Sequence, residues 1–226
     1  MIKAIFFDLD GTIIDTEPAA GRAIEKCFEK AGIKLKAGDA DFITGRTWES
    51  AFEYLFSVYA VPFPHERLKE NVLRTYRQEL QRELPQVAGS AEAVKSLAAK
   101  FPLALVSGST RSDILWALDH LKIRHCFKTV VGAEDYPNSK PSPDPYLTAM
   151  KELGINPGQG LAFEDSLAGI TSANAAGLYV VAISSTNHLG QDTTQAQAKI
   201  KDLQGITPKW IEEFSSGNLK PMPSYG

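Results

Sequence analysis

Polar residues that could act in catalysis follow the apolar segments of this chain. Asp8 and Asp10 end the first apolar segment, and Ser107 ends the second. Glu164 and Asp165 end a later one. Carboxylate oxygens are the ligands that Mg²⁺ prefers in proteins, where it binds one or two carboxylates together with substrate phosphate and water. These residue types therefore indicate a site that binds a divalent cation together with an anion such as a phosphate.

Two loops could bind the anion itself. Lys140 lies in the loop after the third apolar segment, where Pro141 biases its backbone toward an extended conformation. Gly108 lies in a turn of small residues that leads into a predicted helix, so backbone N–H groups there could surround a phosphate. Ser142 and Pro143 are typical of an N-cap followed by the first helical residue, which would fix the backbone near the lysine.

The apolar segments are rich in β-branched residues and do not alternate with polar residues, which is typical of strands buried on both faces of a parallel sheet. They are 2–8, 102–107, 128–133, 160–164 and 178–184. Helical patterns lie between them, at 90–100, 110–121, 143–153 and 166–176. This alternation predicts an α/β fold with a doubly wound, Rossmann-like parallel sheet. Ligands bind such sheets at the carboxyl ends of the strands, so we expect the polar residues above to form one site.

One interval contains helical patterns only. They are 19–31, 48–59 and 65–84, and turns are predicted at 31–41 and 60–65. About 70 residues without a strand is too long for an ordinary crossover between strands. We therefore expect a core domain of 1–15 plus 87–226 and an inserted helical domain of 16–86. The last residues, 217–226, are predicted to be a flexible tail.

Composition limits the partners of the protein. A net charge of −3 over 226 residues provides no broad basic surface, so we expect neither a nucleic acid nor a membrane as partner. No apolar run approaches the roughly 20 residues of a membrane-spanning helix, and no secretion signal is present, which predicts a cytoplasmic protein. Cys27 and Cys126 are expected to be free, buried thiols. We expect a monomer.

Each motif has a structural alternative when it is taken alone. Asp8 and Asp10 could belong to a turn that ends a strand, Ser107 is common in such a turn, and Lys140 could be a solvated loop lysine. The acidic residues before 166 could simply favour the N-terminus of a helix. Walker A, GxGxxG and GxSxG patterns are absent from the sequence. The coincidence of these residues at four strand ends favours a shared site over separate structural roles.

Four segments resemble, in their order and spacing, the motifs of the haloacid dehalogenase superfamily. They are DLDGT at 8–12, VSGS at 106–109, SKPSPDPY at 139–146 and FEDSLAGITSANAAG at 163–177. The helical insert after the first motif is similar to the C1 cap of that superfamily. DTE at 15–17 resembles the β-phosphoglucomutase-like group and its small sugar phosphatases.

The resemblance implies a mechanism with a covalent intermediate. Asp8 would be the nucleophile that forms an aspartyl-phosphate, and Asp10 would be the general acid and base. Mg²⁺ would be held by the carboxylates of Asp8 and Asp165 and by the backbone carbonyl of Asp10, with Glu164 supporting or joining these ligands. Dehalogenases and phosphonatases of the superfamily lack an aspartate at the position of Asp10, so its presence favours phosphate esters.

The resemblance also implies a substrate class. Ser107, Gly108 and Lys140 would bind the oxygens of the transferring phosphoryl group, where positive charge offsets developing negative charge. Glu17 and Arg46 are candidates for contact with the rest of the substrate. The implied activity is magnesium-dependent hydrolysis of a small phosphate monoester of the sugar or polyol phosphate class.

Two alternatives remain at this stage. β-Phosphoglucomutases carry an arginine three residues after a glycine and a lysine just before a tyrosine in the cap. Here Arg46 follows Gly45 directly, and no lysine precedes Tyr76 at the matching place. This favours a hydrolase over a mutase. A non-catalytic binding protein on the same fold is the other alternative, and the complete set of motif residues argues against it.

Overall fold

The computed structural model describes residues 1–43, 48–188 and 190–217. Arg46 and residues 218–226 of the predicted tail lie outside this description. The chain forms two compact units, and each is described by itself. The core unit comprises Met1–Ile14, Gln86–Asn187 and Gln191–Gly226, and the helical unit comprises Asp15–Pro85 and His188–Gly190.

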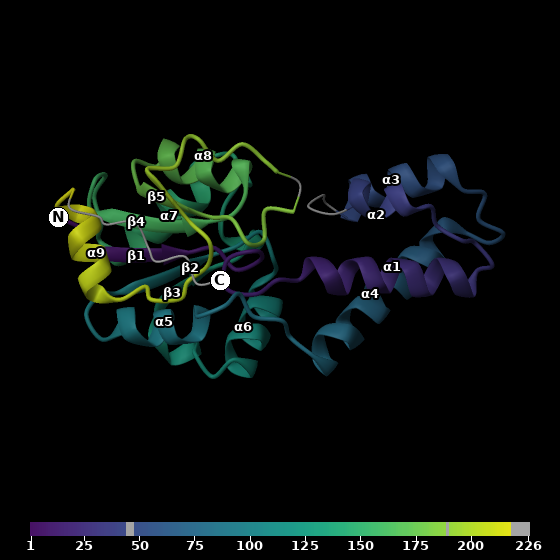
Figure 1. Ribbon diagram of the computed structural model, residues 1–226, viewed down its shortest axis with the longest axis horizontal. Coiled ribbons are helices and arrows are strands. Elements are labelled where there is room, and N and C mark those ends of the chain that lie inside the picture. Colours follow the sequence, from purple (N-terminus) through teal and green to yellow (C-terminus); the bar gives the residue numbers. More distant parts are fainter. Residues whose placement is uncertain (44–47, 189, 218–226) are drawn as a thin grey trace. The chain divides into compact units, whose positions relative to one another are not determined.

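A parallel sheet of six strands forms the centre of the core unit (Figure 1). The strands are β1 (Ala4–Phe7), β2 (Leu103–Val106), β3 (Phe127–Val131), β4 (Gly160–Glu164), β5 (Tyr179–Ile183) and β6 (Ala198–Ile200). Their order is β3-β2-β1-β4-β5-β6, so the chain runs outward from β1 in both directions. Every residue of β1, β2 and β4 is buried, as expected for strands that are covered on both faces.

Helices cover both faces of this sheet. They are α5 (Ser90–Ala98), α6 (Arg111–His120), α7 (Asp144–Leu153), α8 (Leu167–Ala175) and α9 (Pro208–Ser215). Figure 1 shows α8 on one side of the sheet and α5 and α6 on the other. Single 3-10 turns flank β3, at Arg124–Cys126 and Ala133–Asp135. The predicted α/β class with a doubly wound parallel sheet is confirmed.

Two elements of the core unit were not predicted from the sequence. Strand β6 has only three residues, and only the last of them is buried, so it produces no apolar run. Helix α9 packs through Trp210, whose ring lies 6.3 Å from that of Phe163 and 5.6 Å from that of Phe214. Its eight residues are too few for a clear helical pattern in the sequence.

The helical unit contains four helices in its described residues. They are α1 (Glu17–Lys30), α2 (Ala37–Ile43), α3 (Trp48–Val58) and α4 (His65–Arg82). Buried Phe28, Phe52, Leu55 and Val72 pack together between them. Helices α1 and α4 are also joined at the surface, because Lys26 and its neighbour Arg22 both pair with Glu79 of α4.

The turn predicted at 31–41 is wrong in its second half, because α2 begins at Ala37. Gly38 and Asp39 are weak helix formers, so the local sequence favours a turn. The Asp39 carboxylate is buried and accepts hydrogen bonds from the backbone N–H of Lys36 and from the hydroxyls of Tyr54 and Tyr59. These contacts with residues distant in the sequence stabilise the helix.

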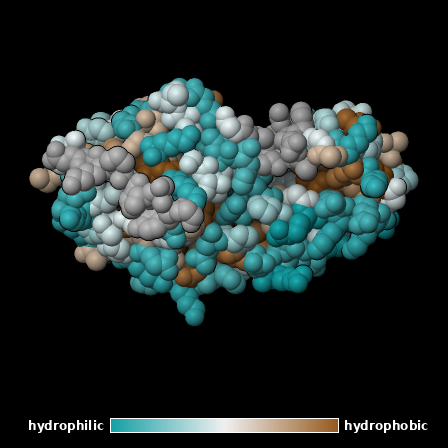
Figure 2. Space-filling view, in the orientation of Figure 1, coloured by the Kyte–Doolittle hydropathy of each residue, from teal (hydrophilic) through white to brown (hydrophobic). Residues whose placement is uncertain are grey.

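Hydrophilic residues cover most of the face drawn in Figure 2. Across the described ranges, no helix has both the length and the apolar character that crossing a bilayer requires. Cys27 and Cys126 are buried and form no disulfide, which confirms the prediction of free thiols.

Candidate active site

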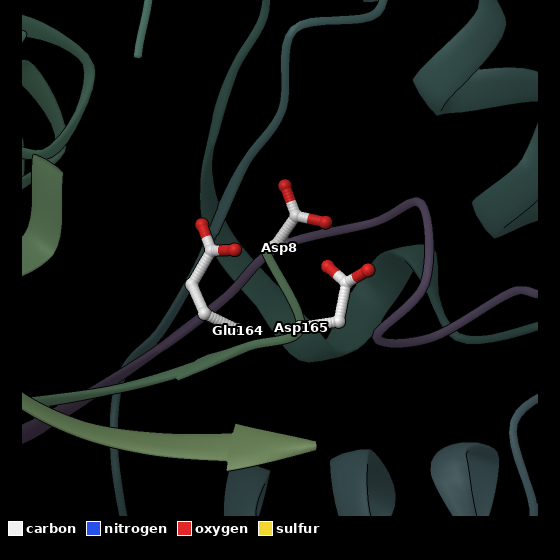
Figure 3. A group of neighbouring side chains, drawn as sticks. All are labelled: Asp8, Glu164 and Asp165. Carbon is white, nitrogen blue, oxygen red and sulfur yellow. The ribbon is translucent and has the colours of Figure 1, made fainter. Parts of the chain in front are cut away.

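Three carboxylates meet where β1 and β4 end. These strands are parallel neighbours in which Phe7 is paired with Phe163, so the residues that follow them in the chain lie at the same level. The backbone N–H of Asp8 extends the ladder by donating to the carbonyl of Phe163 at 3.1 Å. One oxygen from each of Asp8, Glu164 and Asp165 lies within 4.8 Å of the others. Figure 3 shows the Asp8 carboxylate between those of Glu164 and Asp165.

Two glycines leave the space that these carboxylates occupy. Gly11 has a φ of +83°, and a Cβ there would lie 2.1 Å from Oδ2 of Asp165. A Cβ on Gly169, in the first turn of α8, would lie 1.9 Å from Oε2 of Glu164. Real Cβ contacts are never this short, so any side chain at either position would force the neighbouring carboxylate to move. The glycines are therefore required by the site itself.

Lys140 links the carboxylates to the edge of β2. Its ammonium group donates to Oδ1 of Asp8 at 2.6 Å, to Oε1 of Glu164 at 2.6 Å and to the carbonyl of Val106 at 3.1 Å. The hydroxyl of Tyr146 donates to the same Glu164 oxygen at 2.6 Å, and the ammonium lies 5.1 Å from the centre of the Tyr146 ring. Lys140 is thus held by Asp8, which directly follows β1, together with side chains of β4 and α7.

The start of α7 differs by one residue from the prediction. Pro143 is the N-cap and the helix begins at Asp144, whereas Ser142 was expected to cap a helix that begins at Pro143. Ser142 still accepts the backbone N–H of Asp144 at 3.4 Å, and its carbonyl accepts the hydroxyl of Ser172 at 2.5 Å. The second contact ties the loop that carries Lys140 to α8.

The three carboxylates of the site do not readily ionise together. Burial is the main cause that raises the pKa of Asp8 to about 8, against an ordinary value of 3.8. Burial and repulsion from Asp8 and Glu164 raise the pKa of Asp165 well above its ordinary value. Burial would lower the pKa of Lys140, but attraction to Asp8 and Glu164 raises it well above 10.5. Three carboxylates thus compete for one ammonium group, and two of them hold their protons unless further positive charge is bound. A cluster of hard oxygen donors that lacks positive charge fits a divalent cation such as Mg²⁺.

A turn of hydroxyl residues follows β2 beside the carboxylates. Ser107 is buried, and its Oγ accepts the backbone N–H of Ser109 at 3.0 Å. The hydroxyl of Ser109 donates to Oδ2 of Asp10 at 2.9 Å. Gly108 between them is exposed, and a Cβ there would meet no atom within 4 Å. The turn therefore brings Ser107 and Gly108 to the same edge as Asp8 and Asp10.

The N-terminus of α6 is partly occupied by the chain's own side chains. The backbone N–H of Arg111 donates to the carboxylate of Glu134, at 3.0 Å for the closer oxygen. The backbone N–H of Asp113 donates to the hydroxyl of Thr110, which is the N-cap. We expected this helix terminus to surround a phosphate. Two of the N–H groups expected there are already used.

The structure brings most of the predicted site residues together. Six of them lie at the carboxyl edge of the sheet: Asp8, Asp10, Ser107, Lys140, Glu164 and Asp165. Glu17 is the first residue of α1 in the helical unit, and Arg46 lies outside the described residues. Sequence reasoning did not identify Tyr146 or Ser109 as parts of the site. The only signal was that both fall within the motif segments that contain Lys140 and Ser107.

Comparison with known proteins defines the class to which this fold and site belong. A model of the haloacid dehalogenase-like hydrolases matches residues 5–183. The chain therefore belongs to the haloacid dehalogenase-like hydrolases, and its helical insert between β1 and β2 is placed like the cap of the C1 type. This confirms the predicted family and the predicted enzyme class, a phosphatase of this superfamily.

Particular relatives are similar over most of their length. Fructose-1-phosphate phosphatase YqaB of Escherichia coli (strain K12) is 33% identical over 180 residues, which are 78% of this chain and 94% of that protein. Phosphorylated carbohydrates phosphatase of Thermotoga maritima is 29% identical over 180 residues, 78% of this chain and 82% of that protein. The structure of β-phosphoglucomutase from Clostridium difficile has the same fold, with a TM-score of 0.74 at 24% identity, covering 96% of this chain and 98% of that one.

Proposed function

We propose that this protein hydrolyses a small phosphate monoester of the sugar or polyol phosphate class, with Asp8 as the nucleophile. The observation that carries the proposal is the position of Lys140, which contacts Asp8 and Glu164 at the meeting point of three strand ends. A buried ammonium group beside a buried carboxylate is suited to binding a phosphoryl group next to its nucleophile. The three N–H groups of Lys140 already have acceptors, so Lys140 would donate to a phosphoryl oxygen in place of one of them.

Hydrolysis would proceed in two displacements on phosphorus. In the first, an oxygen of Asp8 forms a bond to phosphorus, the bond to the ester oxygen breaks, and Asp10 gives its proton to that oxygen. In the second, Asp10 takes a proton from a water molecule, which attacks phosphorus and releases phosphate and the Asp8 carboxylate. Ser107, the N–H of Gly108 and Lys140 would hold the phosphoryl oxygens during both steps.

Magnesium would be bound by Asp8 and Asp165, with the backbone carbonyl of Asp10, and Glu164 would support this set. Bound Mg²⁺ supplies positive charge that reduces repulsion between a carboxylate nucleophile and a phosphate dianion. The clustering of three carboxylates, and the raised pKa of Asp8 where no cation is bound, support this assignment.

The substrate class rests on the relatives. Two of them are named as phosphatases of fructose 1-phosphate and of phosphorylated carbohydrates. We propose that the helical unit acts as a cap that contacts the alcohol portion of the substrate, while the core unit binds the phosphoryl group. Glu17 and Arg46 stay candidates for this contact.

The test is phosphate release from a panel of phosphorylated sugars and polyols, with p-nitrophenyl phosphate as a general substrate. We expect release that requires Mg²⁺, stops on addition of EDTA and is lost in Asp8→Asn. Asp8→Asn keeps the side-chain shape and is checked for folding by circular dichroism. Hydrolysis that persists in Asp8→Asn would reject the proposed nucleophile.

The same preparation distinguishes a hydrolase from a mutase. A mutase would convert β-glucose 1-phosphate to glucose 6-phosphate when a glucose bisphosphate is added as primer, with little release of phosphate. We expect phosphate release to exceed isomerisation. Isomerisation without net phosphate release would favour the mutase and reject the hydrolase.

A further inference from the structure

Ser109 connects the turn after β2 with Asp10. Its hydroxyl donates to Oδ2 of Asp10 at 2.9 Å, although 99 residues separate the two in the chain. Its backbone N–H donates to Oγ of Ser107 at 3.0 Å. One residue therefore contacts both the proposed acid and base and a proposed phosphate ligand.

The backbone of Ser109 is held on both sides. Its N–H is bonded to Ser107 within the turn, and its carbonyl accepts the N–H of Ala133 at 3.0 Å, from the segment after β3. The next residue, Thr110, is the N-cap of α6, and its hydroxyl accepts the backbone N–H of Asp113. A hydroxyl on such a restrained backbone can orient a partner more closely than one on a free loop.

Asp10 benefits from such a partner, because its side chain is only half-buried at the edge of the site. A carboxylic acid can transfer its proton efficiently only when the correct oxygen faces the leaving group. Because Oδ2 of Asp10 accepts the hydrogen bond from Ser109, we infer that Oδ1 carries the transferable proton.

We propose that Ser109 is a positioning residue that orients Asp10 for transfer of the proton to the leaving oxygen. This inference rests on the proposed function. In the first displacement, the phosphorus–oxygen bond breaks while the proton moves from Oδ1 of Asp10 to the departing oxygen, and Ser109 keeps its own proton throughout. Ser109 therefore acts on the step that depends on the leaving group.

This role predicts a dependence on the leaving group that a purely structural role does not produce. Nitrophenolate departs readily without protonation, whereas the alkoxide of a sugar or polyol needs the proton. The test compares kcat/KM for p-nitrophenyl phosphate and for a polyol phosphate such as glycerol phosphate, because kcat/KM reports the steps up to the first displacement.

We expect Ser109→Ala to lower kcat/KM for glycerol phosphate about 10-fold, which corresponds to about 1.4 kcal/mol and is the size of one lost hydrogen bond. For p-nitrophenyl phosphate the expected change is less than about 2-fold. Ser109→Thr keeps the hydroxyl and should restore the ratio of the two values. Ser112→Ala, an exposed serine in the first turn of α6, is the matched control and should leave both values unchanged.

Three outcomes contradict this role. Equal losses for both esters in Ser109→Ala would assign Ser109 to phosphate binding or to folding. Unchanged values for both would show that Asp10 needs no such partner. Failure of Ser109→Thr to restore the ratio would also overturn it. By contrast, a wild-type protein that hydrolyses neither ester rejects the proposed function, and with it this inference.

Discussion

The ammonium group of Lys140 lies 2.6 Å from the carboxylate of Asp8, which is 132 residues earlier in the chain. Both side chains are largely buried, at 12% and 10% exposed, and Glu164 on the other side of the ammonium is 1% exposed. Water therefore screens these charges little, and the arrangement is stable only when all partners are present. We therefore expect the pair to matter for folding and, under the proposed function, for catalysis.

We expect Lys140→Met to lower both stability and activity. Removing the ammonium leaves two buried carboxylates without their cation, which should cost about 3–5 kcal/mol of unfolding free energy. Loss of a positive group at the phosphoryl oxygens should lower kcat about 100-fold or more. Urea unfolding and phosphate release measure the two effects. Lys151→Met, at an exposed lysine of α7, is the control, and an equal effect there would contradict the assignment.

Replacing Gly169 by alanine should have opposite effects on the site and on the helix that contains this residue. Alanine favours an interior helical position over glycine by about 1 kcal/mol, so α8 alone would gain stability. The new Cβ would lie 1.9 Å from Oε2 of Glu164 and would displace that carboxylate from Lys140. We therefore expect a large loss of kcat. Gly21→Ala in α1, where a Cβ meets no atom within 4 Å, should leave kcat unchanged and raise the melting temperature slightly.

The stabilising effect of Mg²⁺ should increase with pH. The pKa of Asp8 is raised to about 8 in the metal-free folded chain, against 3.8 ordinarily. Folding therefore takes up a proton between these values, and the stability that this uptake provides is lost as pH rises toward the folded pKa. Mg²⁺ needs the ionised carboxylate, so it competes with this proton.

Melting temperatures with Mg²⁺ and with EDTA, compared at about pH 5 and about pH 8, measure this effect. We expect the larger increase at the higher pH, and a smaller one in Asp165→Asn at both. An increase that is independent of pH, or that is undiminished in Asp165→Asn, would place the metal elsewhere.

Asp39 should stabilise the helical unit in a pH-dependent way. Burial would raise its pKa, but hydrogen bonds from Tyr59, the Lys36 N–H and Tyr54 outweigh burial and lower it. A lowered pKa contributes stability above the unfolded value of 3.8 that is lost as pH falls through the folded pKa.

Asp39→Asn should therefore lower the free energy of unfolding by about 1–3 kcal/mol at neutral pH, because the hydroxyls of Tyr54 and Tyr59 lose their charged acceptor. The difference from wild type should shrink in acid, as measured by urea unfolding at a series of pH values. Asp192→Asn, at a carboxylate of the core unit that accepts the backbone N–H of Thr194, provides a comparison outside the helical unit. A constant difference at all pH values for Asp39→Asn would refute the role of its charge.

The sequence contains enough information for the sheet and for the residues at its edge. Continuous apolar segments such as 160–164 favour buried strands, although β3 is buried only at Val131, and the parallel order then places Asp8 and Asp165 at one edge. The contribution of Tyr146 could not be inferred, because it depends on the direction of a side chain one turn into α7. The same holds for Ser109, whose contact with Asp10 depends on the backbone conformation of the turn after β2.

Elements were missed where tertiary contacts outweigh local preference. Helix α2 is stabilised by hydrogen bonds from Tyr54 and Tyr59 to Asp39, and the local sequence pattern does not predict these contacts. Strand β6 is stabilised by pairing with β5, where Ile200 lies opposite Ile183. The assignments of Glu17, Arg46 and Gly108 to substrate or phosphate stay predictions, as do the domain limits, a monomeric state and a cytoplasmic location.

The central claim is that Asp8 becomes phosphorylated during turnover. The most direct measurement is mass spectrometry of the protein quenched in acid while it is hydrolysing a phosphate ester, followed by mapping of the modified peptide. The account predicts one phosphoryl group on the peptide that contains Asp8, which appears and decays with turnover and is absent from Asp8→Asn. Turnover without any phosphorylated protein, or a phosphoryl group on another residue, would contradict it.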